Sequence, residues 1–146
     1  MSLNRTVRLL VVSMVIACVA AQARAAEKPA KVPDHYVAAI YFHRTQRCPT
    51  CRKISAYIDE AIHSAFAKQL KAKTVMFTLM DYQDPKNEKF TRGYKVKSPI
   101  LVIADVHHGK VVQWKPMRSV WTLIGKKAEF FKYVQDGVHG FLEPKQ

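Results

Sequence analysis

The sequence contains no internal repeat and no low-complexity tract. These absences exclude a repeat architecture and a disordered chain. A chain of 146 residues also leaves little room for a second domain. Hydrophobic residues make up 49% of the chain and charged residues 24%. This is enough apolar material for one core, so we expect one globular domain.

Long hydrophobic runs are missing except near the N-terminus, where Leu9 to Ala21 is almost wholly apolar. Arg5 and Arg8 precede this run, and Ala23-Arg24-Ala25 follows it as an A-x-A cleavage site. The pattern is typical of a secretory signal peptide and predicts its removal from residues 1–25. The run is shorter than the roughly 20 residues that a spanning helix needs, which disfavours a retained anchor.

A lipoprotein signal is the alternative interpretation of the same segment. Val15-Ile16-Ala17-Cys18 resembles a lipobox, in which Cys18 would carry the lipid anchor. Each interpretation takes the domain out of the cytoplasm, so we expect a periplasmic or secreted protein, which the lipoprotein alternative would tether to the membrane. Residues 26–34 are polar with two prolines and are predicted to form a linker before a domain over residues 35–142.

Acidic residues are scarce, with 11 Asp and Glu against 24 Lys and Arg and a net charge of +13. Without the three arginines of residues 1–25 the net charge is about +10. A nucleic-acid partner has to be considered for such a charge. The basic residues are scattered, however, and an exported protein rarely meets nucleic acid. We therefore expect a solvated basic surface or attraction to anionic lipid or an acidic partner, and no nucleic acid.

Cysteine is scarce as well, and of three cysteines only Cys48 and Cys51 lie in the predicted domain. An exported domain meets oxidising conditions that permit a disulfide. A bridge across two intervening residues closes too short a loop to restrain the unfolded chain much. The pair is therefore better explained by thiol–disulfide exchange than by stability.

Further metal ligands around the two cysteines are not evident. A zinc site would need two more ligands, and His43, His63, His107 and His108 form no second paired cluster. Covalent haem attachment needs C-x-x-C-H, but residue 52 is Arg52. His107 and His108 are expected to be plain hairpin-turn residues. We expect no cofactor and no metal, with copper delivery through the cysteines as the alternative.

The hydrophobic pattern predicts four strands and three helical regions. The apolar residues from Ile54 to Leu70 recur at three- and four-residue steps, which predicts a long amphipathic helix beginning at Pro49. Asp84 and Pro85 predict the start of a short helix that ends near Gly93. The predicted strands are Tyr36 to His43, Thr74 to Tyr82, Ile100 to Val106 and Val111 to Trp114.

The final helical region is predicted to be capped by Ser119. Gly125 interrupts it, leaving either one kinked helix or a short helix followed by a longer one. Trp114, Trp121, Phe130 and Phe131 are expected in the core. The resulting order is β-α-β-α-β-β-α, an α/β fold with a mixed sheet of about four strands flanked by helices.

Three features together resemble the thioredoxin superfamily over residues 35–141. They are the C-x-x-C motif of Cys48 and Cys51 at a strand–helix junction, Ser98-Pro99 before the third strand, and the element order. The resemblance implies a thioredoxin fold in which Cys48 attacks and Cys51 resolves. It also implies that Pro99 is a cis-proline that lies against the disulfide and presents backbone to a substrate chain.

Two longer stretches narrow the resemblance. YFHRTQRCPTCRKISAYIDEAI and VVQWKPMRSVWTLIGKKAEFFKYV are similar to small secreted bacterial thioredoxin-like proteins. Some of these are labelled nitroreductase-associated subunits, found beside arsenical efflux transporters. The chain departs from thioredoxin proper because Arg47 replaces a tryptophan, Pro49-Thr50 replaces Gly-Pro, and no acidic residue ends the first strand.

The chemistry predicted for Cys48 depends on its thiolate. A helix N-terminus stabilises a negative charge by roughly 0.3 to 1 kcal/mol. Nearby cations would add to this, and Thr50 could donate a hydrogen bond to a sulfur. The expected supporting residues are Pro49, Thr50, Ser98, Pro99, His43 and Arg47.

The sequence thus predicts an exported thiol–disulfide oxidoreductase, with its direction left open. Its expected partners are exported protein thiols or disulfides and a membrane or periplasmic electron donor. The alternative is a non-catalytic accessory or copper-carrying module on the same fold.

Overall fold

The computed structural model describes residues 32–142. The predicted signal peptide, with its alternative lipid anchor at Cys18, lies outside the described residues, as does most of the linker. The elements are β1 (His35–His43), α2 (Pro49–Lys71), β2 (Val75–Asp81), η1 (Pro85–Asn87), α3 (Glu88–Gly93), β3 (Ile100–His107), β4 (Lys110–Met117), η2 (Arg118–Val120) and α4 (Lys127–Leu142). None of the helices among these residues is both long and apolar enough to span a membrane.

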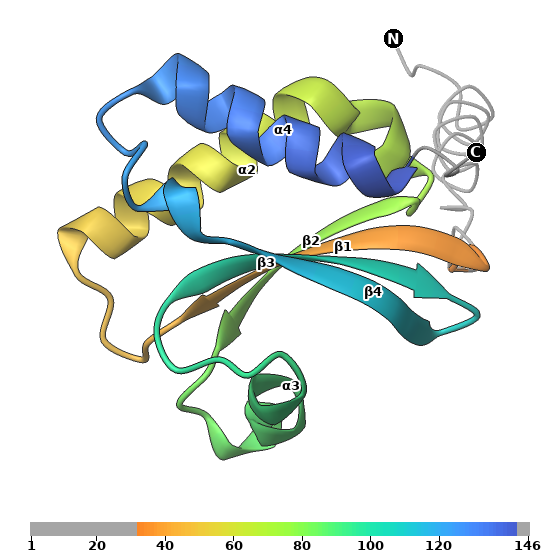
Figure 1. Cartoon of the computed structure of the whole chain (residues 1–146), viewed down its shortest axis with the longest axis horizontal. Coiled ribbons are helices and arrows are strands. Elements are labelled where there is room, and N and C mark those ends of the chain that lie inside the picture. Colours follow the sequence, from red (N-terminus) through yellow and green to blue (C-terminus); the bar gives the residue numbers. More distant parts are fainter. Residues whose placement is uncertain (1–31, 143–146) are drawn as a thin grey trace, which may run out of the picture. The chain divides into compact units, whose positions relative to one another are not determined.

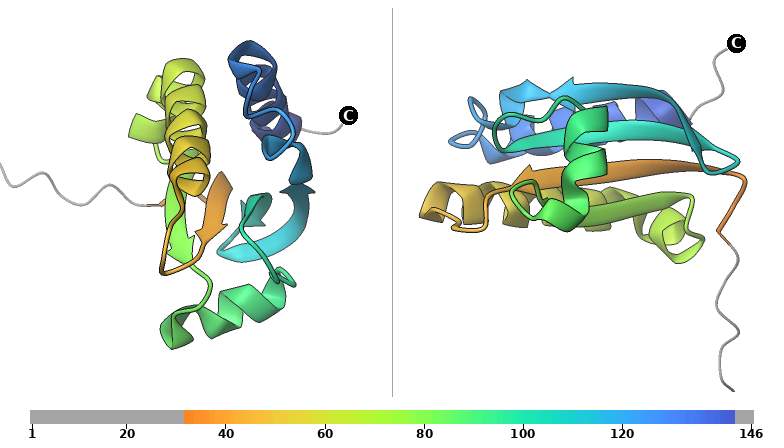
Figure 2. Two further views of the ribbon diagram at one scale, coloured as in Figure 1. Left: turned by 90° about the vertical axis from the view of Figure 1, so that its left-hand side faces the viewer. Right: turned by 90° about the horizontal axis from the view of Figure 1, so that it is seen from below.

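The four strands form one mixed sheet in the order β2-β1-β3-β4. β1 pairs in parallel with β2 and antiparallel with β3, which pairs antiparallel with β4. Helices α2 and α4 lie side by side over one face of the sheet, and α3 lies on the other face (Figures 1 and 2). The α/β architecture and element order predicted from the sequence are confirmed.

β1 is a central strand because its residues are apolar on both faces. Val37, Ala39 and Tyr41 belong to the larger core cluster, which packs against α2 and α4. Ile40 and Phe42 belong to a smaller cluster on the α3 face. Burial on both faces fixes the register of the strand and hence where it ends. The end of β1 therefore holds the segment that leads to the cysteines in a defined place.

α2 begins at Pro49, whose missing N–H costs nothing in the first turn. Its apolar stripe is buried against the sheet, and Ile54, Ile58 and Phe66 are 0% exposed. The stripe fixes the rotation of the helix about its axis. This rotation leaves Cys48, just before the helix, exposed to solvent and buries Cys51 one turn further along.

The predicted turn chemistry is largely confirmed. The Asp84 carboxylate accepts from the Lys86 N–H at 3.0 Å and caps η1, after which α3 runs to Gly93. The β3–β4 hairpin turns at His108 and Gly109, with φ of 50° and 73°. Two central residues with positive φ match the right-handed twist of the flanking strands.

Two details of the C-terminal part differ from the prediction. The cap at Ser119 is wrong, because η2 already begins at Arg118 and Ser119 lies inside it. The chain makes a short 3-10 helix followed by the separate helix α4, which decides the alternative that Gly125 left open. β4 also extends beyond Trp114 to Met117, including Pro116, which an edge strand tolerates.

Candidate active site at the cysteine pair

Cys48 and Cys51 lie at the N-terminus of α2 and form a disulfide, with Cα atoms 5.1 Å apart. Cys48 is the N-cap residue, and its sulfur accepts a hydrogen bond from the Cys51 N–H at 3.2 Å. Cys48 is exposed, whereas Cys51 is only 7% exposed. One sulfur is therefore open to a reaction partner, and the other is enclosed by the helix.

The segment between β1 and α2 is tied to the end of β2. The Thr45 hydroxyl donates to Oδ2 of Asp81 at 2.7 Å, and the Gln83 N–H donates to Oδ1 at 2.9 Å. Nε of Arg44 donates to the Tyr82 hydroxyl at 2.9 Å. The hydrogen bond from Thr45 is the main cause that lowers the pKa of Asp81 below its ordinary value. These contacts fix the position of the chain segment that leads from β1 to Cys48.

Arg47 reaches along α2, and its guanidinium donates from Nη2 to Oγ of Ser55. The Ser55 hydroxyl donates in turn to the Arg52 carbonyl at 2.8 Å. Ser55 lies four residues after Cys51, so it occupies the same face of the helix one turn further along. Nε of Arg47 is buried without a hydrogen-bond partner among the described residues. Arg47 thus places a half-buried positive charge beside Ser55, in the second turn of α2.

Tyr41 was missed by the sequence analysis. It is 0% exposed, and its hydroxyl has no hydrogen-bond partner among residues 32–142. Burial raises the pKa of Tyr41 to about 12, with the charge of Arg47 acting in the opposite direction. Successive side chains of a strand point to opposite faces of the sheet, so Tyr41 shares a face with Val37 and Ala39, beneath α2. This alternation could have placed Tyr41 from the sequence.

The other predicted supporting residues near the pair have separate places. Nδ1 of His43 makes a hydrogen bond with the Arg44 carbonyl at 2.9 Å, so the imidazole holds the connecting segment. Pro49 and Thr50 form the exposed first turn of α2. Their predicted roles in exchange stay predictions.

The predicted cis-proline is wrong, because none of the described residues has a cis peptide bond. A trans bond before proline is favoured by about 0.5 to 1 kcal/mol. The Pro99 carbonyl accepts from Nε1 of Trp121 at 2.9 Å, which holds this trans segment. Trp121 is 37% exposed and is therefore not the core residue that we expected. Ser98 is exposed just before Pro99.

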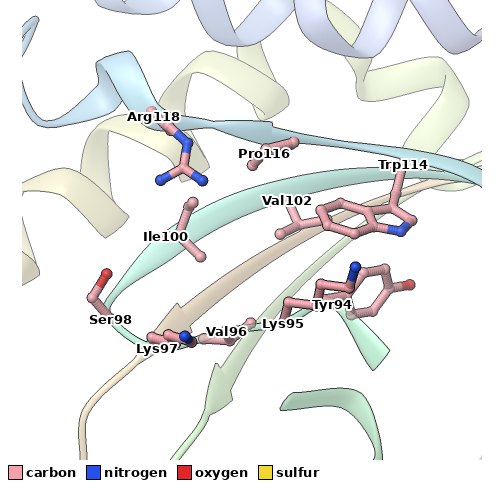
Figure 3. A pocket seen from close by; sticks show the side chains of 10 residues that line it. All are labelled: Tyr94, Lys95, Val96, Lys97, Ser98, Ile100, Val102, Trp114, Pro116 and Arg118. Carbon is pink, nitrogen blue, oxygen red and sulfur yellow. The ribbon is translucent and has the colours of Figure 1, made fainter. Parts of the chain in front are cut away.

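Ser98 and Pro99 still lie at the sheet end from which α2 starts, since Ile100 pairs with Phe42. A cavity of about 210 Å³ extends from this end along the α3 face of the sheet (Figure 3). Tyr94 and Trp114 line it, and the guanidinium of Arg118 points toward the side where Ser98 lies (Figure 3). This cavity could not be predicted from local patterns, because its walls come from separate segments of the chain.

The parallel β1–β2 pair, the antiparallel β3–β4 hairpin and the cysteines at the N-terminus of the first long helix decide the architecture. The domain has a thioredoxin fold. No protein-family model and no curated protein matches the chain.

Solved thioredoxins are similar to the chain in structure. Thioredoxin from Trypanosoma brucei brucei is 18% identical over 69% of this chain and 79% of its own, with a TM-score of 0.41. Fasciola hepatica thioredoxin is 18% identical over 70% and 81%, with a TM-score of 0.39. Tryparedoxin II from C. fasciculata is 20% identical over 64% and 72%, with a TM-score of 0.40. Such values are too low to transfer an activity to this chain.

The thioredoxin fold together with a paired Cys48 and Cys51 supports a thiol–disulfide redox function.

Proposed function

We propose that this chain is an exported thiol–disulfide oxidoreductase that exchanges disulfides with protein partners. The observation that carries the proposal is the unequal exposure of the pair, with Cys48 open at the helix N-terminus and Cys51 7% exposed. Exchange chemistry needs one accessible sulfur that meets the substrate and a second one held back to resolve the intermediate. A purely structural bridge needs no such difference.

In the reducing direction, the Cys48 thiolate attacks one sulfur of a substrate disulfide, and the other substrate sulfur leaves as a thiolate. Cys51 then loses its proton and attacks Cys48, which releases the second substrate thiolate. The substrate gains two electrons and two protons, and the Cys48–Cys51 disulfide forms. The N–H groups at the start of α2 favour the Cys48 thiolate, and the Cys51 N–H already points at this sulfur.

The same steps in reverse oxidise a substrate dithiol and leave the pair reduced. The reduction potential of the pair decides which direction dominates. Turnover as a reductase requires a membrane or periplasmic electron donor, and turnover as an oxidase requires an acceptor there. The basis for this location is the signal-peptide pattern of residues 1–25.

The partner surface is proposed to include Pro99 and Trp121, which lie at the end of the sheet that leads to Cys48. The Trp121 indole is partly exposed and fixes the Pro99 carbonyl. Arg118 adds a positive charge to the wall of the cavity that Ser98 also lines (Figure 3). A protein segment with apolar and acidic side chains fits this combination.

The first experiment titrates the purified chain in glutathione redox buffers under metal-free conditions, with thiols counted by alkylation mass shift. The background is Cys18→Ser, so that Cys48 and Cys51 are the only thiols. We expect one reversible two-electron transition. Cys51→Ser should trap partners as mixed disulfides, because nothing resolves the Cys48 bond, and Cys48→Ser should trap none.

A pair that does not cycle would overturn the proposal. So would equal trapping by Cys48→Ser and Cys51→Ser, because exposure would then not determine which sulfur attacks. Cycling that begins only after metal is removed would favour the copper-carrying alternative. Among residues 32–142, the only group of three or more His, Cys, Asp and Glu side chains suited to a metal leaves out both cysteines.

A further inference from the structure

We propose that His35, Asp105 and His107 form a binding site for a divalent transition-metal ion, with zinc as the ion that the donor set fits best. The three ligating atoms lie within 4.8 Å of one another. The site is separate from the cysteine pair and does not depend on the proposed exchange activity.

The sheet register brings the three side chains together. His35 begins β1 and pairs with His107 at the end of β3. Asp105 lies two residues before His107, so both project from the same face of β3. The two imidazole rings stack with centroids 4.3 Å apart and planes inclined by 23°. Parallel stacking turns both Nε2 atoms toward the same carboxylate.

The distances are close to those of a metal centre. Nε2 of His35 is 2.9 Å from Oδ1 of Asp105, and Nε2 of His107 is 3.0 Å from the same oxygen. Ligand atoms of a tetrahedral zinc site are about 3.3 Å apart when the bonds are about 2.0 to 2.1 Å long. Each of the two nitrogen–oxygen distances needs to lengthen by only a few tenths of an ångström to reach this value, and the third distance, between the two Nε2 atoms, is no more than 4.8 Å. Each imidazole would then bind through Nε2 with its proton on Nδ1.

The carboxylate is buried and oriented by a further residue. The Asp105 side chain is 7% exposed, and Oδ2 accepts from Nε2 of Gln113 at 2.8 Å. Gln113 lies opposite Asp105 on β4, next to a register shift between Asp105 and Val106. Such irregularities re-aim side chains at the end of a strand pair. Hydrogen bonds of this kind hold a metal-binding carboxylate in place.

The donor set determines the class of ion. Two imidazole nitrogens and one carboxylate suit zinc and other first-row transition metals better than calcium or magnesium, which prefer oxygen ligands. The His35 and His107 side chains are 39% and 44% exposed, so an ion can enter from solvent. Three protein ligands leave a coordination position for water or an exchangeable ligand.

The site lies at the end of the sheet opposite the disulfide. His35 is the first residue of β1, while Cys48 follows its last residue, His43. Nine extended residues separate the two ends by about 25 Å to 30 Å. A metal at this end therefore cannot touch the sulfur atoms, and the two sites can be tested separately.

The test measures zinc binding by calorimetry in a chain carrying Cys18→Ser, Cys48→Ser and Cys51→Ser, which removes every thiol. Cobalt absorption spectra report the geometry of the same site. We expect one zinc ion per chain and tetrahedral cobalt bands. His35→Ala and His107→Ala should each weaken zinc binding at least 100-fold, and Gln113→Ala should weaken it about 10- to 100-fold.

His63→Ala is the matched control, because His63 pairs with Asp59 at 3.2 Å on the exposed side of α2. This variant should keep full affinity and the same cobalt spectrum. Circular dichroism of each metal-free variant checks that the domain is folded. No saturable zinc binding by the folded thiol-free chain would overturn the proposal, as would equal binding by the His35→Ala, His107→Ala double variant.

Discussion

At the scale of single residues, the polar ends of two side chains near the candidate site differ in whether they find a hydrogen-bond partner. The hydroxyl of Tyr41 ends in the apolar layer beneath α2 without a partner among the described residues. The guanidinium of Arg47 ends at Ser55. An unpaired buried hydroxyl costs about 1 to 3 kcal/mol, so this position sacrifices stability.

Tyr41→Phe should therefore raise the free energy of unfolding by about 1 kcal/mol at neutral pH, because it removes the unpaired hydroxyl and keeps the ring. Urea unfolding of the variant and the original chain measures this difference. A loss of more than about 1 kcal/mol would instead mean that the hydroxyl has a partner in the folded protein.

The same variant should change the alkaline pH dependence. The folded-state pKa of Tyr41 is about 12, above the ordinary value of 10.0. The folded chain therefore holds this proton more tightly, and the stabilisation is complete below pH 10 and lost as the pH rises toward 12. The free energy of unfolding, measured between pH 10 and 12, should decline less steeply with pH in Tyr41→Phe than in the original chain. An unchanged slope would contradict the buried assignment.

At the scale of elements, hydrogen bonds between segments determine how β1 delivers the chain to α2. Thr45 joins this connection to Asp81 at the end of β2. α4 completes the layer over the sheet, and its Gly137 passes close to Met117 of β4. Both contacts join residues that are far apart in the chain.

Thr45→Val should flatten the acid dependence of stability. The pKa of Asp81 lies below 3.8 mainly because of the Thr45 hydrogen bond. The folded chain thus holds this proton less tightly, so the stabilisation exists at neutral pH and disappears as the pH falls below about 4. Thermal unfolding at neutral and acidic pH should show a smaller loss of Tm in Thr45→Val. Thr45→Ser keeps the hydroxyl and should behave like the original chain; a flattened Thr45→Ser profile would contradict this account.

The two glycines near the end of α4 should respond oppositely to alanine. A Cβ at Gly140 meets nothing within 4 Å, so Gly140→Ala should stabilise by about 0.5 to 1 kcal/mol. A Cβ at Gly137 would lie 2.5 Å from Cε of Met117, a side chain that is 0% exposed. Gly137→Ala should therefore destabilise, since overpacking costs about 1 to 3 kcal/mol. Urea unfolding compares the two variants, and equal stabilities would contradict the packing.

At the scale of the whole molecule, the sheet separates two kinds of chemistry. The cysteine pair lies at the end where β1 leads into α2, and the His35–Asp105–His107 cluster lies at the other end. The core between them consists mainly of aliphatic and aromatic side chains from the sheet, from α2 and α4, and from the segment that follows α3. Neither core cluster includes Cys48 or Cys51, so the fold should survive reduction of the disulfide.

Reduction of the Cys48–Cys51 disulfide should lower the free energy of unfolding by no more than about 2 kcal/mol, the chain-entropy value for a four-residue loop. Urea unfolding with and without reductant, in the Cys18→Ser background, measures the change. The Cys48→Ser, Cys51→Ser variant should match the reduced chain. Unfolding of the whole domain on reduction would mean that the bridge is structural.

Much of the fold could be predicted because its signals are local. The apolar run of β1, the stripe of α2 and the Asp84 cap each depend on neighbouring residues. One error is local, since Ser119 lies inside η2 and does not cap it. The others concern the segment around Pro99, which a distant residue contacts. Trp121 was expected inside, but its indole lies near the surface on the Pro99 carbonyl, and the peptide bond before Pro99 is trans.

The sequence by itself determined the element order, the strand–helix junction that carries Cys48 and Cys51, and the turn at His108 and Gly109. Periodicity, proline and glycine act within a few residues, so their effects can be read along the chain. Only the tertiary structure decided which distant residues become partners. His35 and Asp105, for example, are 70 residues apart in the chain and form a hydrogen bond. Strand register and packing fix such pairs, and both depend on the whole chain folding at once.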